Sequence, residues 1–283
     1  MTDSPSAAAA GTVRLGGRDV NRLGFGAMRI TGDGVWGPPD DPDTAHHVLQ
    51  RSVELGVQLI DTADSYGPDV SEELIAEALH PYPNDVIIAT KGGLERGGPG
   101  DWSANGRPEH LREACEGSLR KLGVDCIDLY QLHAPDSDVP YEESVGALVE
   151  LRDEGKIAHI GVSNVNSEEL SAALGLTEIA SVQNRFNLSD RHNEDVLETC
   201  TDEGIVFLPW FPLGAGTPAR VAEELGRERG VSAHAVAIAW LLHRSPVIVP
   251  IPGTSSLGHL EENVAAASLE LSESELAQLS DSA

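Results

Sequence analysis

Short apolar runs alternate with longer stretches of mixed polarity along the whole chain. The run at residues 86–91 begins with four apolar residues in succession. Strands of a parallel sheet are buried on both faces and therefore form continuous apolar runs of this length. Eight runs fit this description, at residues 22–26, 58–61, 86–91, 127–133, 157–164, 179–184, 205–210 and 247–251. The pattern predicts a parallel sheet whose strands are separated by helices.

The stretches between these runs have helical periodicity. Asp41 and Pro42 provide an N-cap and a proline suited to the first helical position, and Gly56 suits a helix end. Between them, Ala45 and Leu49 are spaced to share one face with other apolar residues. Similar helices are expected near residues 71–79, 109–121, 141–154, 167–174, 192–203, 219–229, 232–243 and 258–267.

The alternation of eight strands with helices predicts an α/β fold of the (β/α)8 TIM-barrel type. Residues 12–19 alternate in polarity around Gly16-Gly17, which is typical of a hairpin. We expect this N-terminal β-hairpin to plug the bottom of the barrel. Residues 11–283 are then predicted to form one domain, and residues 1–10 a disordered tail.

Polar side chains follow successive strands at the point where each strand ends. In a barrel of this type the active site lies at the carboxyl ends of the strands. A single polar residue at such a position is often a turn residue, but a succession of them indicates a site. The residues are Asp61, Lys91, His133, Ser163 with Asn164, and Gln183.

Lys91 stands out because the chain has only three lysines against sixteen arginines. A buried, unpaired ammonium loses several kcal/mol of solvation, so a lysine at a dry strand end suggests that the site needs an amine. The alternative is a surface lysine just beyond the strand. Tyr66 follows Asp61 by five residues and can return its phenol to the same rim.

These side chains predict acid catalysis. A free tyrosine has a pKa of about 10, and a nearby ammonium stabilises the phenolate and lowers that pKa. We therefore expect Lys91 to lower the pKa of Tyr66, and Asp61 to keep Lys91 charged. His133 is expected to donate a hydrogen bond to a carbonyl oxygen and to share in the proton transfer.

Five segments together give the chain a clear resemblance to the aldo-keto reductases, over about residues 12–283. The segments are Gly56-Val-Gln-Leu-Ile-Asp-Thr-Ala-Asp-Ser-Tyr-Gly67, Ile88-Ala-Thr-Lys91, Asp128-Leu-Tyr-Gln-Leu-His133, Gly155-Lys-Ile-Ala-His-Ile-Gly-Val-Ser-Asn164 and Ile251-Pro-Gly-Thr-Ser-Ser-Leu-Gly-His-Leu-Glu-Glu-Asn263. The segments at 21–28 and 34–39 are similar to a pyridoxal-reductase-like bacterial branch. The resemblance implies NADPH-dependent reduction of an aldehyde or ketone substrate to an alcohol.

By position, the resemblance assigns catalysis to Asp61, Tyr66, Lys91 and His133, with Tyr66 as general acid. It assigns the nicotinamide carboxamide to Ser163, Asn164 and Gln183, and ring stacking to Trp210. The remaining cofactor residues that it implies are Gly26, Ala27, Met28, Asp61, Phe211, Pro212, Leu213, Gly214, Gly216, Ile251, Gly253, Thr254, Ser255, His259, Glu262 and Asn263. Trp36 and Trp102 are expected either to line the substrate pocket or to pack within loops.

The chain departs from the family pattern at the adenosine end. Many relatives have Lys and Arg around the 2′-phosphate, where this chain has Gly253 and His259. The loss of one charge-assisted pair costs about 1.5–3 kcal/mol, so we expect NADPH as cofactor with NADH also accepted.

Two other functions stay open on the residues alone. Lys91 could form a Schiff base with a carbonyl substrate, as a lyase does. The barrel could also be a non-catalytic, regulatory subunit that binds NADPH. The first leaves Tyr66 and Gln183 without a role, and the second leaves the catalytic four without one.

The overall charge excludes some partners. The net charge is −27 and the pI is about 4.5, so neither nucleic acid nor an anionic membrane is an expected partner. Acidic residues spread along a lysine-poor chain are typical of salt-loving organisms; the alternative is an ordinary acidic protein.

No metal site is expected, since His46-His47 lacks converging ligands. No signal peptide or membrane span is recognisable, which predicts a cytoplasmic protein. The oligomeric state is not predictable.

Overall fold

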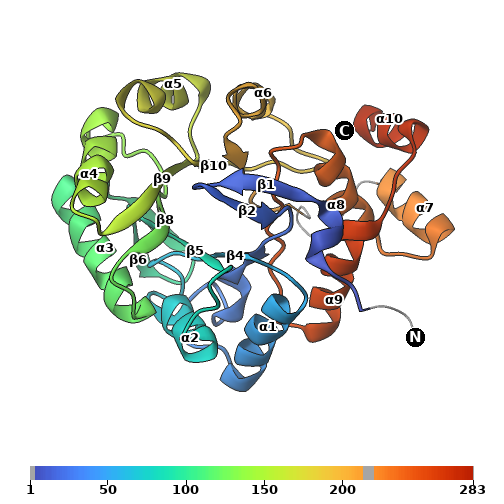
Figure 1. The fold of residues 1–283 in the computed structure, drawn as a ribbon, viewed down its shortest axis with the longest axis horizontal. Coiled ribbons are helices and arrows are strands. Elements are labelled where there is room, and N and C mark those ends of the chain that lie inside the picture. The colour runs from blue at the N-terminus through green and yellow to red at the C-terminus, as the bar shows by residue number, and fades with distance from the viewer. Residues whose placement is uncertain (1–3, 213–219, 283) are drawn as a thin grey trace.

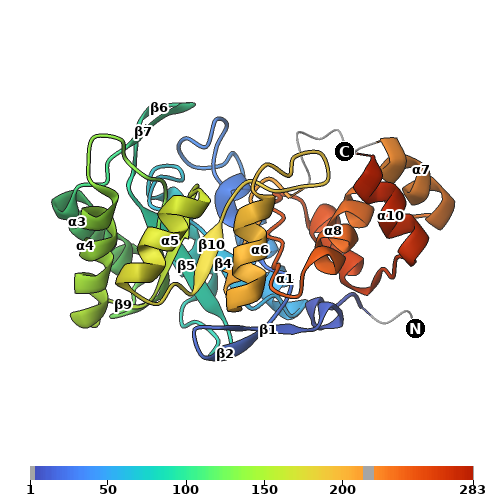
Figure 2. The ribbon, with the colours of Figure 1, turned by 90° about the horizontal axis from the view of Figure 1, so that it is seen from above.

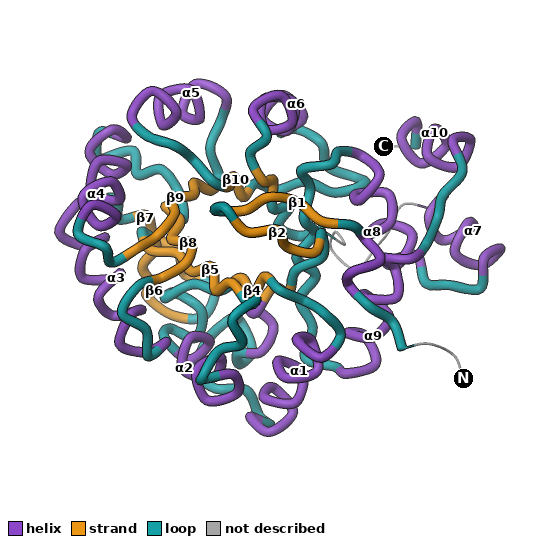
Figure 3. The backbone as a smooth tube through the Cα atoms, viewed as in Figure 1, coloured by secondary structure: helices purple, strands orange, loops and turns teal. Residues whose placement is uncertain are grey.

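A computed structural model describes residues 4–212 and 220–282 of the chain. Parallel strands curl into a barrel wall with helices on the outside (Figure 1, Figure 3). The strand order is β11-β10-β9-β8-β5-β4-β3. The strands are β3 (Phe25–Gly26), β4 (Leu59–Asp61), β5 (Ile87–Gly92), β8 (Ile127–Leu132), β9 (Ile157–Ser163), β10 (Ser181–Gln183) and β11 (Val206–Phe207). The predicted (β/α)8 fold is confirmed.

The predicted eighth strand is not a regular strand. Residues 247–251 make only an isolated bridge, between Ile248 and Phe207, within the described part of the chain. Pro250 has no N–H, so it cannot continue a ladder of hydrogen bonds. Its carbonyl oxygen instead accepts a hydrogen bond of 2.9 Å from the Gly24 N–H, just before β3. The segment therefore closes the barrel between β11 and β3 without forming a full strand.

The predicted hairpin covers the bottom of the barrel. It consists of β1 (Thr12–Leu15) and β2 (Arg18–Asn21), which lie across the barrel centre in Figure 1. Leu15 and Val20 are buried against inward-facing residues of the barrel strands. These apolar contacts fill the amino-terminal end of the barrel and leave the opposite end for the site.

The helices have short polar caps where the sequence indicates them. The Asp41 carboxylate, for example, accepts a hydrogen bond from the Thr44 N–H at the start of α1. The helices are α1 (Pro42–Glu54), α2 (Val70–Leu79), α3 (Pro108–Leu122), α4 (Tyr141–Asp153), α5 (Ser167–Leu176), α6 (Glu194–Glu203), α7 (Arg220–Arg229), α8 (Ala233–Arg244), α9 (Leu257–Ala265) and α10 (Glu273–Asp281). The last of these was not predicted, although its N-cap Ser272 and Glu275 form a capping box.

The expectation of a disordered tail over residues 1–10 is wrong for its second half. Ala7–Ala10 form a short 3-10 helix (η1), capped by the side chain of Ser6. Ala7 is fully buried, and its N–H donates a hydrogen bond of 2.8 Å to the Leu55 carbonyl oxygen. The small alanine side chain packs against the outer core, which orders this segment.

A second hairpin rises at the end of the barrel opposite to the plug. It consists of β6 (Leu94–Gly98) and β7 (Asp101–Ala104), which follow β5 directly. Figure 2 shows this hairpin on one side of the barrel and β1 and β2 on the other.

No helix in the described ranges has both the length and the apolar character needed to cross a membrane.

Candidate active site

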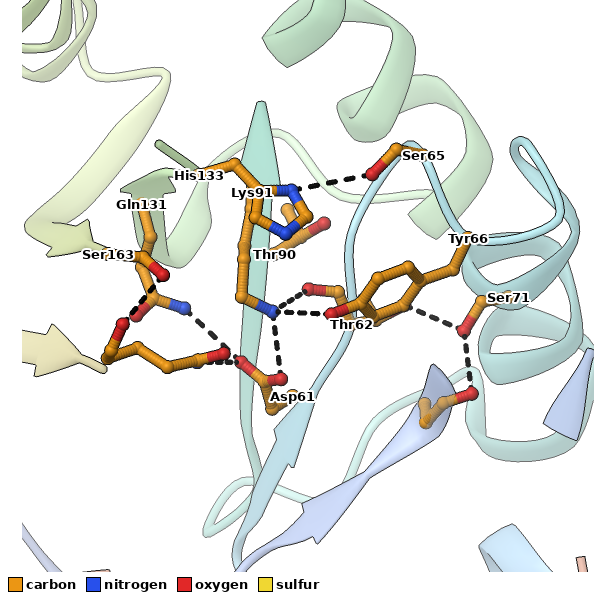
Figure 4. A network of polar contacts seen from close by, with 12 residues as sticks. Asp61, Thr62, Ser65, Tyr66, Ser71, Thr90, Lys91, Gln131, His133 and Ser163 are labelled. Carbon is orange, nitrogen blue, oxygen red and sulfur yellow. Dashed lines mark hydrogen bonds and ion pairs between the residues drawn. The ribbon is translucent and has the colours of Figure 1, made fainter. Parts of the chain in front are cut away.

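Asp61 and Lys91 form a buried ion pair at the carboxyl ends of β4 and β5. Lys91 Nζ lies 2.8 Å from Asp61 Oδ2 and donates a second hydrogen bond, also of 2.8 Å, to the Thr62 carbonyl oxygen (Figure 4). Burial alone lowers the pKa of Lys91, but the Asp61 carboxylate outweighs it and holds that pKa above its ordinary value. The amine is therefore a cation at neutral pH.

The second oxygen of Asp61 is held by two amide side chains. Gln183 Nε2 donates to Asp61 Oδ1 over 2.7 Å, and Gln131 Nε2 donates to the same atom over 3.3 Å. The two glutamines project from β10 and β8, which flank β9. These two donors, together with Lys91, fix the buried carboxylate in position. Gln131 was not among the predicted site residues, although it lies near the end of β8, two residues before His133.

Tyr66 lies in the loop after β4, with its hydroxyl 3.4 Å from Lys91 Nζ. Burial raises the pKa of this phenol above its usual value, and the nearby Lys91 opposes that rise without reversing it. The predicted net lowering of the Tyr66 pKa is therefore wrong, because the low-dielectric pocket penalises phenolate more than one cation stabilises it. The phenol consequently keeps its proton at neutral pH and has it available to give.

His133 follows β8 and completes the cluster. Its ring is edge-to-face with Tyr66, at 5.9 Å between centroids, and its Nδ1 lies 3.4 Å from Ser65 Oγ. Burial, and then the charge of Lys91, hold the pKa of His133 well below its usual range. A neutral imidazole can donate a hydrogen bond to an oxygen but carries no extra proton. All four residues of the cluster are at most 7% exposed.

A cleft of about 670 Å³ opens from this cluster toward α9. Most of the predicted cofactor residues line it, namely Gly26, Met28, Asp61, Ser163, Asn164, Gln183, Trp210, Phe211, Pro212, Ile251, Gly253, Thr254, His259, Glu262 and Asn263. Ala27 does not, because its side chain is buried in the core, and Ser255 is exposed outside the lining. Leu213, Gly214 and Gly216 lie outside the described residues.

Asn164 connects the cluster to the indole of Trp210. Its Nδ2 donates a hydrogen bond of 2.9 Å to the His133 carbonyl oxygen, and its Oδ1 accepts one of 2.9 Å from Trp210 Nε1. Its φ of 59° lies in the left-handed region, which asparagine tolerates better than most residues. The neighbouring Ser163 hydroxyl donates to the Gln183 carbonyl oxygen over 2.7 Å. The three residues assigned to a carboxamide therefore lie together beside Asp61.

Of the two tryptophans considered for a substrate pocket, only Trp102 lines the cleft. Trp36 packs instead in its loop, with the Arg96 guanidinium 5.6 Å from its ring centroid. Three lining residues were not predicted: Arg29, Leu94 and His234.

The close approach of the Gly26 backbone requires a glycine at 253, beside Arg29. A Cβ at Gly253 would lie 3.4 Å from Arg29 Cγ and 2.5 Å from the Gly26 carbonyl oxygen. The aliphatic stem of Arg29 therefore passes close over the Gly253 backbone. The cation comes from the segment after β3, and its stem lies beside Gly253, one of the two positions at which the family pattern has a cation.

The sequence model of the Aldo/keto reductase family matches residues 22–283. The chain belongs to the aldo/keto reductase family. It is 47% identical over 278 residues to an uncharacterized oxidoreductase of Schizosaccharomyces pombe, covering 97% of this chain and 90% of that one. It is 42% identical over 277 residues to the pyridoxine 4-dehydrogenase of Escherichia coli, covering 95% and 96%.

Solved structures of the family have the same fold. The glycerol dehydrogenase of Gluconobacter oxydans superposes with a TM-score of 0.87 at 29% identity, covering 96% of this chain and 95% of that one. An aldo-keto reductase of Klebsiella pneumoniae, solved in complex with NADPH, has a TM-score of 0.81 at 27% identity, with 95% and 94% covered. This aldo/keto reductase is therefore an NAD(P)-dependent oxidoreductase, and the likeness to a pyridoxal-reductase-like branch is confirmed.

Proposed function

We propose that this aldo/keto reductase reduces aldehydes or ketones to alcohols, with NADPH as cofactor and NADH also accepted. The observation that carries the proposal is the buried Asp61–Lys91–Tyr66 chain at the base of the cleft, next to a neutral His133. A phenol that keeps its proton, backed by a fixed cation, is suited to protonate an oxygen that becomes negative.

Each of the four residues has a distinct role in this proposal. A bound dihydronicotinamide supplies hydride to the carbonyl carbon. Tyr66 gives its hydroxyl proton to the carbonyl oxygen, which completes the alcohol and leaves a phenolate. Lys91 stabilises that phenolate, and Asp61 keeps Lys91 charged throughout. His133 donates a hydrogen bond to the same carbonyl oxygen and stays neutral.

The cleft has groups that fit an anionic dinucleotide. Arg29 supplies a cation, and Thr254 lies before the amino terminus of α9, whose first amides favour anions. Trp210 offers a large face for a nicotinamide ring, and the amide-bearing Asn164 and Gln183 lie beside it. We assign the phosphates to Arg29, Thr254 and the α9 terminus. The loop residues Leu213, Gly214 and Gly216 stay predicted pyrophosphate contacts.

The relative named for pyridoxine 4-dehydrogenation makes pyridoxal a substrate to test first. The decisive experiment is a screen of NADPH and NADH oxidation with pyridoxal, benzaldehyde, propanal and simple sugars, at low and high salt. We expect turnover of at least one aldehyde, with NADPH preferred. Tight cofactor binding without turnover across the panel would favour the regulatory barrel.

A Schiff-base lyase at Lys91 has less support. A nucleophilic amine must be neutral, whereas Asp61 holds the pKa of Lys91 above its ordinary value. Borohydride with a carbonyl substrate should therefore leave Lys91 unmodified.

A further inference from the structure

Arg96 lies in the β6–β7 hairpin directly opposite Trp102. The two residues are paired across the antiparallel strands, and the guanidinium carbon lies 3.6 Å from the Trp102 ring centroid. Guanidinium groups stack on aromatic faces in this way, and the interaction is stronger where water is partly excluded. One face of the indole is thus covered by Arg96.

The Arg96 side chain also joins three separate segments through their backbone. It donates to carbonyl oxygens of the 34–35 loop, of the loop that carries Tyr66, and of its own hairpin. The acceptors are Val35 (2.7 Å), Gly34 (2.9 Å), Ser65 (2.9 Å), Asp101 (3.2 Å) and Gly98 (3.3 Å). A planar guanidinium presents five N–H donors in a fixed fork, whereas a lysine ammonium presents three at one point.

The loop at residues 34–37 is strained where it meets Arg96. Val35 has a φ of 56°, which is a genuine outlier for a β-branched residue. Its carbonyl oxygen accepts from Arg96 and also from the Gly67 N–H, at 3.3 Å. Gly67 directly follows Tyr66, so the strained loop, Arg96 and the catalytic loop form one connected unit. Strain of this kind persists only where the surroundings hold it in place.

Trp102 forms a wall of the cleft at the catalytic end. Its ring centroid lies 6.4 Å from that of Tyr66 and 6.4 Å from that of His133, edge-on to both. It is 37% exposed and lines the cleft. The chain has only twelve Trp, Tyr and Phe residues, and four of them line this cleft: Tyr66, Trp102, Trp210 and Phe211. Since we assign Trp210 to the cofactor, Trp102 is the large aromatic surface left for a substrate.

We propose that Arg96 is a positioning residue that holds Trp102 as a fixed wall, so that the site favours flat aromatic aldehydes over aliphatic ones. The inference rests on the carbonyl reduction proposed above. An aromatic ring packed against the indole would bring its aldehyde group to the Tyr66 hydroxyl and His133. Arg96 acts on the substrate through Trp102 and does not contact the reacting atoms.

The test compares Arg96→Ala, Arg96→Lys, Trp102→Ala and the double variant Arg96→Ala/Trp102→Ala, with benzaldehyde and propanal as substrates. We expect Arg96→Ala to raise KM for benzaldehyde about three- to tenfold, the range typical of a lost aromatic contact. KM for propanal and the Kd for NADPH should stay near wild type. Arg96→Lys should resemble Arg96→Ala in KM, because one ammonium cannot replace five hydrogen bonds.

The double variant decides whether Arg96 works through Trp102. If it does, the double variant has the benzaldehyde KM of Trp102→Ala alone, because the wall is already absent. Strictly additive effects, or an unchanged benzaldehyde KM in Arg96→Ala, would overturn the proposal. Arg107→Ala is the matched control, since this exposed arginine has no side-chain hydrogen bond or ion pair to the residues that the structure describes.

A binding measurement separates this proposal from the proposed function. Calorimetry measures the affinity of the NADP-loaded protein for benzyl alcohol, and this affinity depends on the Trp102 wall but not on turnover. Wild type that binds NADPH but reduces no aldehyde would refute the reductase proposal alone. Equal benzyl alcohol affinity in wild type and Arg96→Ala would refute the role of Arg96, whatever the turnover.

Discussion

Lys91→Met removes the ammonium from the candidate site but keeps an unbranched apolar side chain of similar length. The variant breaks three contacts of Lys91 Nζ: those to Asp61 Oδ2 and the Thr62 carbonyl oxygen at 2.8 Å, and that to the Tyr66 hydroxyl at 3.4 Å. Two effects follow, one on catalysis and one on stability, and they have different sizes and readouts.

The catalytic effect comes from the distance between Lys91 and the Tyr66 oxygen. Two unit charges 3.4 Å apart attract each other by about 5 kcal/mol at an effective dielectric constant of about 20. If half of the phenolate charge has developed in the transition state, about 2.5 kcal/mol is lost, which lowers kcat roughly seventyfold. The stability effect comes from Asp61, which loses its cation but keeps its two amide donors; we expect about 3 kcal/mol, the lower end for a broken buried pair.

The assay measures kcat and KM from loss of NADPH absorbance, NADPH binding by fluorescence, and unfolding in urea. Lys121→Met is the matched control, because Lys121 pairs with Asp69 at 2.6 Å and the buried Glu72 at 3.3 Å but does not line the cleft. The control should lose stability while kcat/KM stays near wild type. A folded Lys91→Met protein with wild-type kcat would refute the role given to the cation.

Three further outcomes are expected. Because the pKa of His133 is held well below 6.5 in the fold, its contribution to stability is fully present above pH about 6.5 and is lost as pH falls. The free energy of unfolding in urea should therefore fall by up to about 1.4 kcal/mol per pH unit more in wild type than in His133→Asn. Parallel pH dependences of the two proteins would contradict this. Arg29→Gln should weaken NADPH binding at least about tenfold by fluorescence titration, and an unchanged Kd would exclude Arg29 as a phosphate ligand. With a net charge of −27, the protein should gain thermal stability from low to molar NaCl; a flat or falling Tm would show that screening of self-repulsion is unimportant.

The location of the site at the carboxyl ends of the strands could be predicted from the sequence, because it follows from the topology of the barrel. Once parallel strands alternate with helices, their carboxyl ends must meet at one rim, and Asp61, Lys91 and His133 meet there. This meeting of the strand ends at one rim does not depend on side-chain conformation. It therefore locates the site without describing its contacts.

Other features depend on three-dimensional surroundings that periodicity does not contain. The direction of the Tyr66 pKa shift follows from a balance between burial and the Lys91 charge, and only the structure gives both. The segment at 247–251 has the composition of a strand, but Pro250 interrupts the ladder of hydrogen bonds. The β6–β7 hairpin could have been suspected from Gly97-Gly98-Pro99-Gly100, a strong turn signal. Its Arg96 contacts join segments that are far apart in the sequence.

The central claim is that the Tyr66 hydroxyl protonates a carbonyl oxygen above a bound dihydronicotinamide. Tyr66→Phe removes only that hydroxyl and keeps the buried ring, so the most direct measurement is NADPH binding and aldehyde reduction by this one variant. The account predicts that NADPH binds with nearly the wild-type Kd while carbonyl reduction is abolished. A Tyr66→Phe protein that reduces aldehydes at the wild-type rate would contradict it.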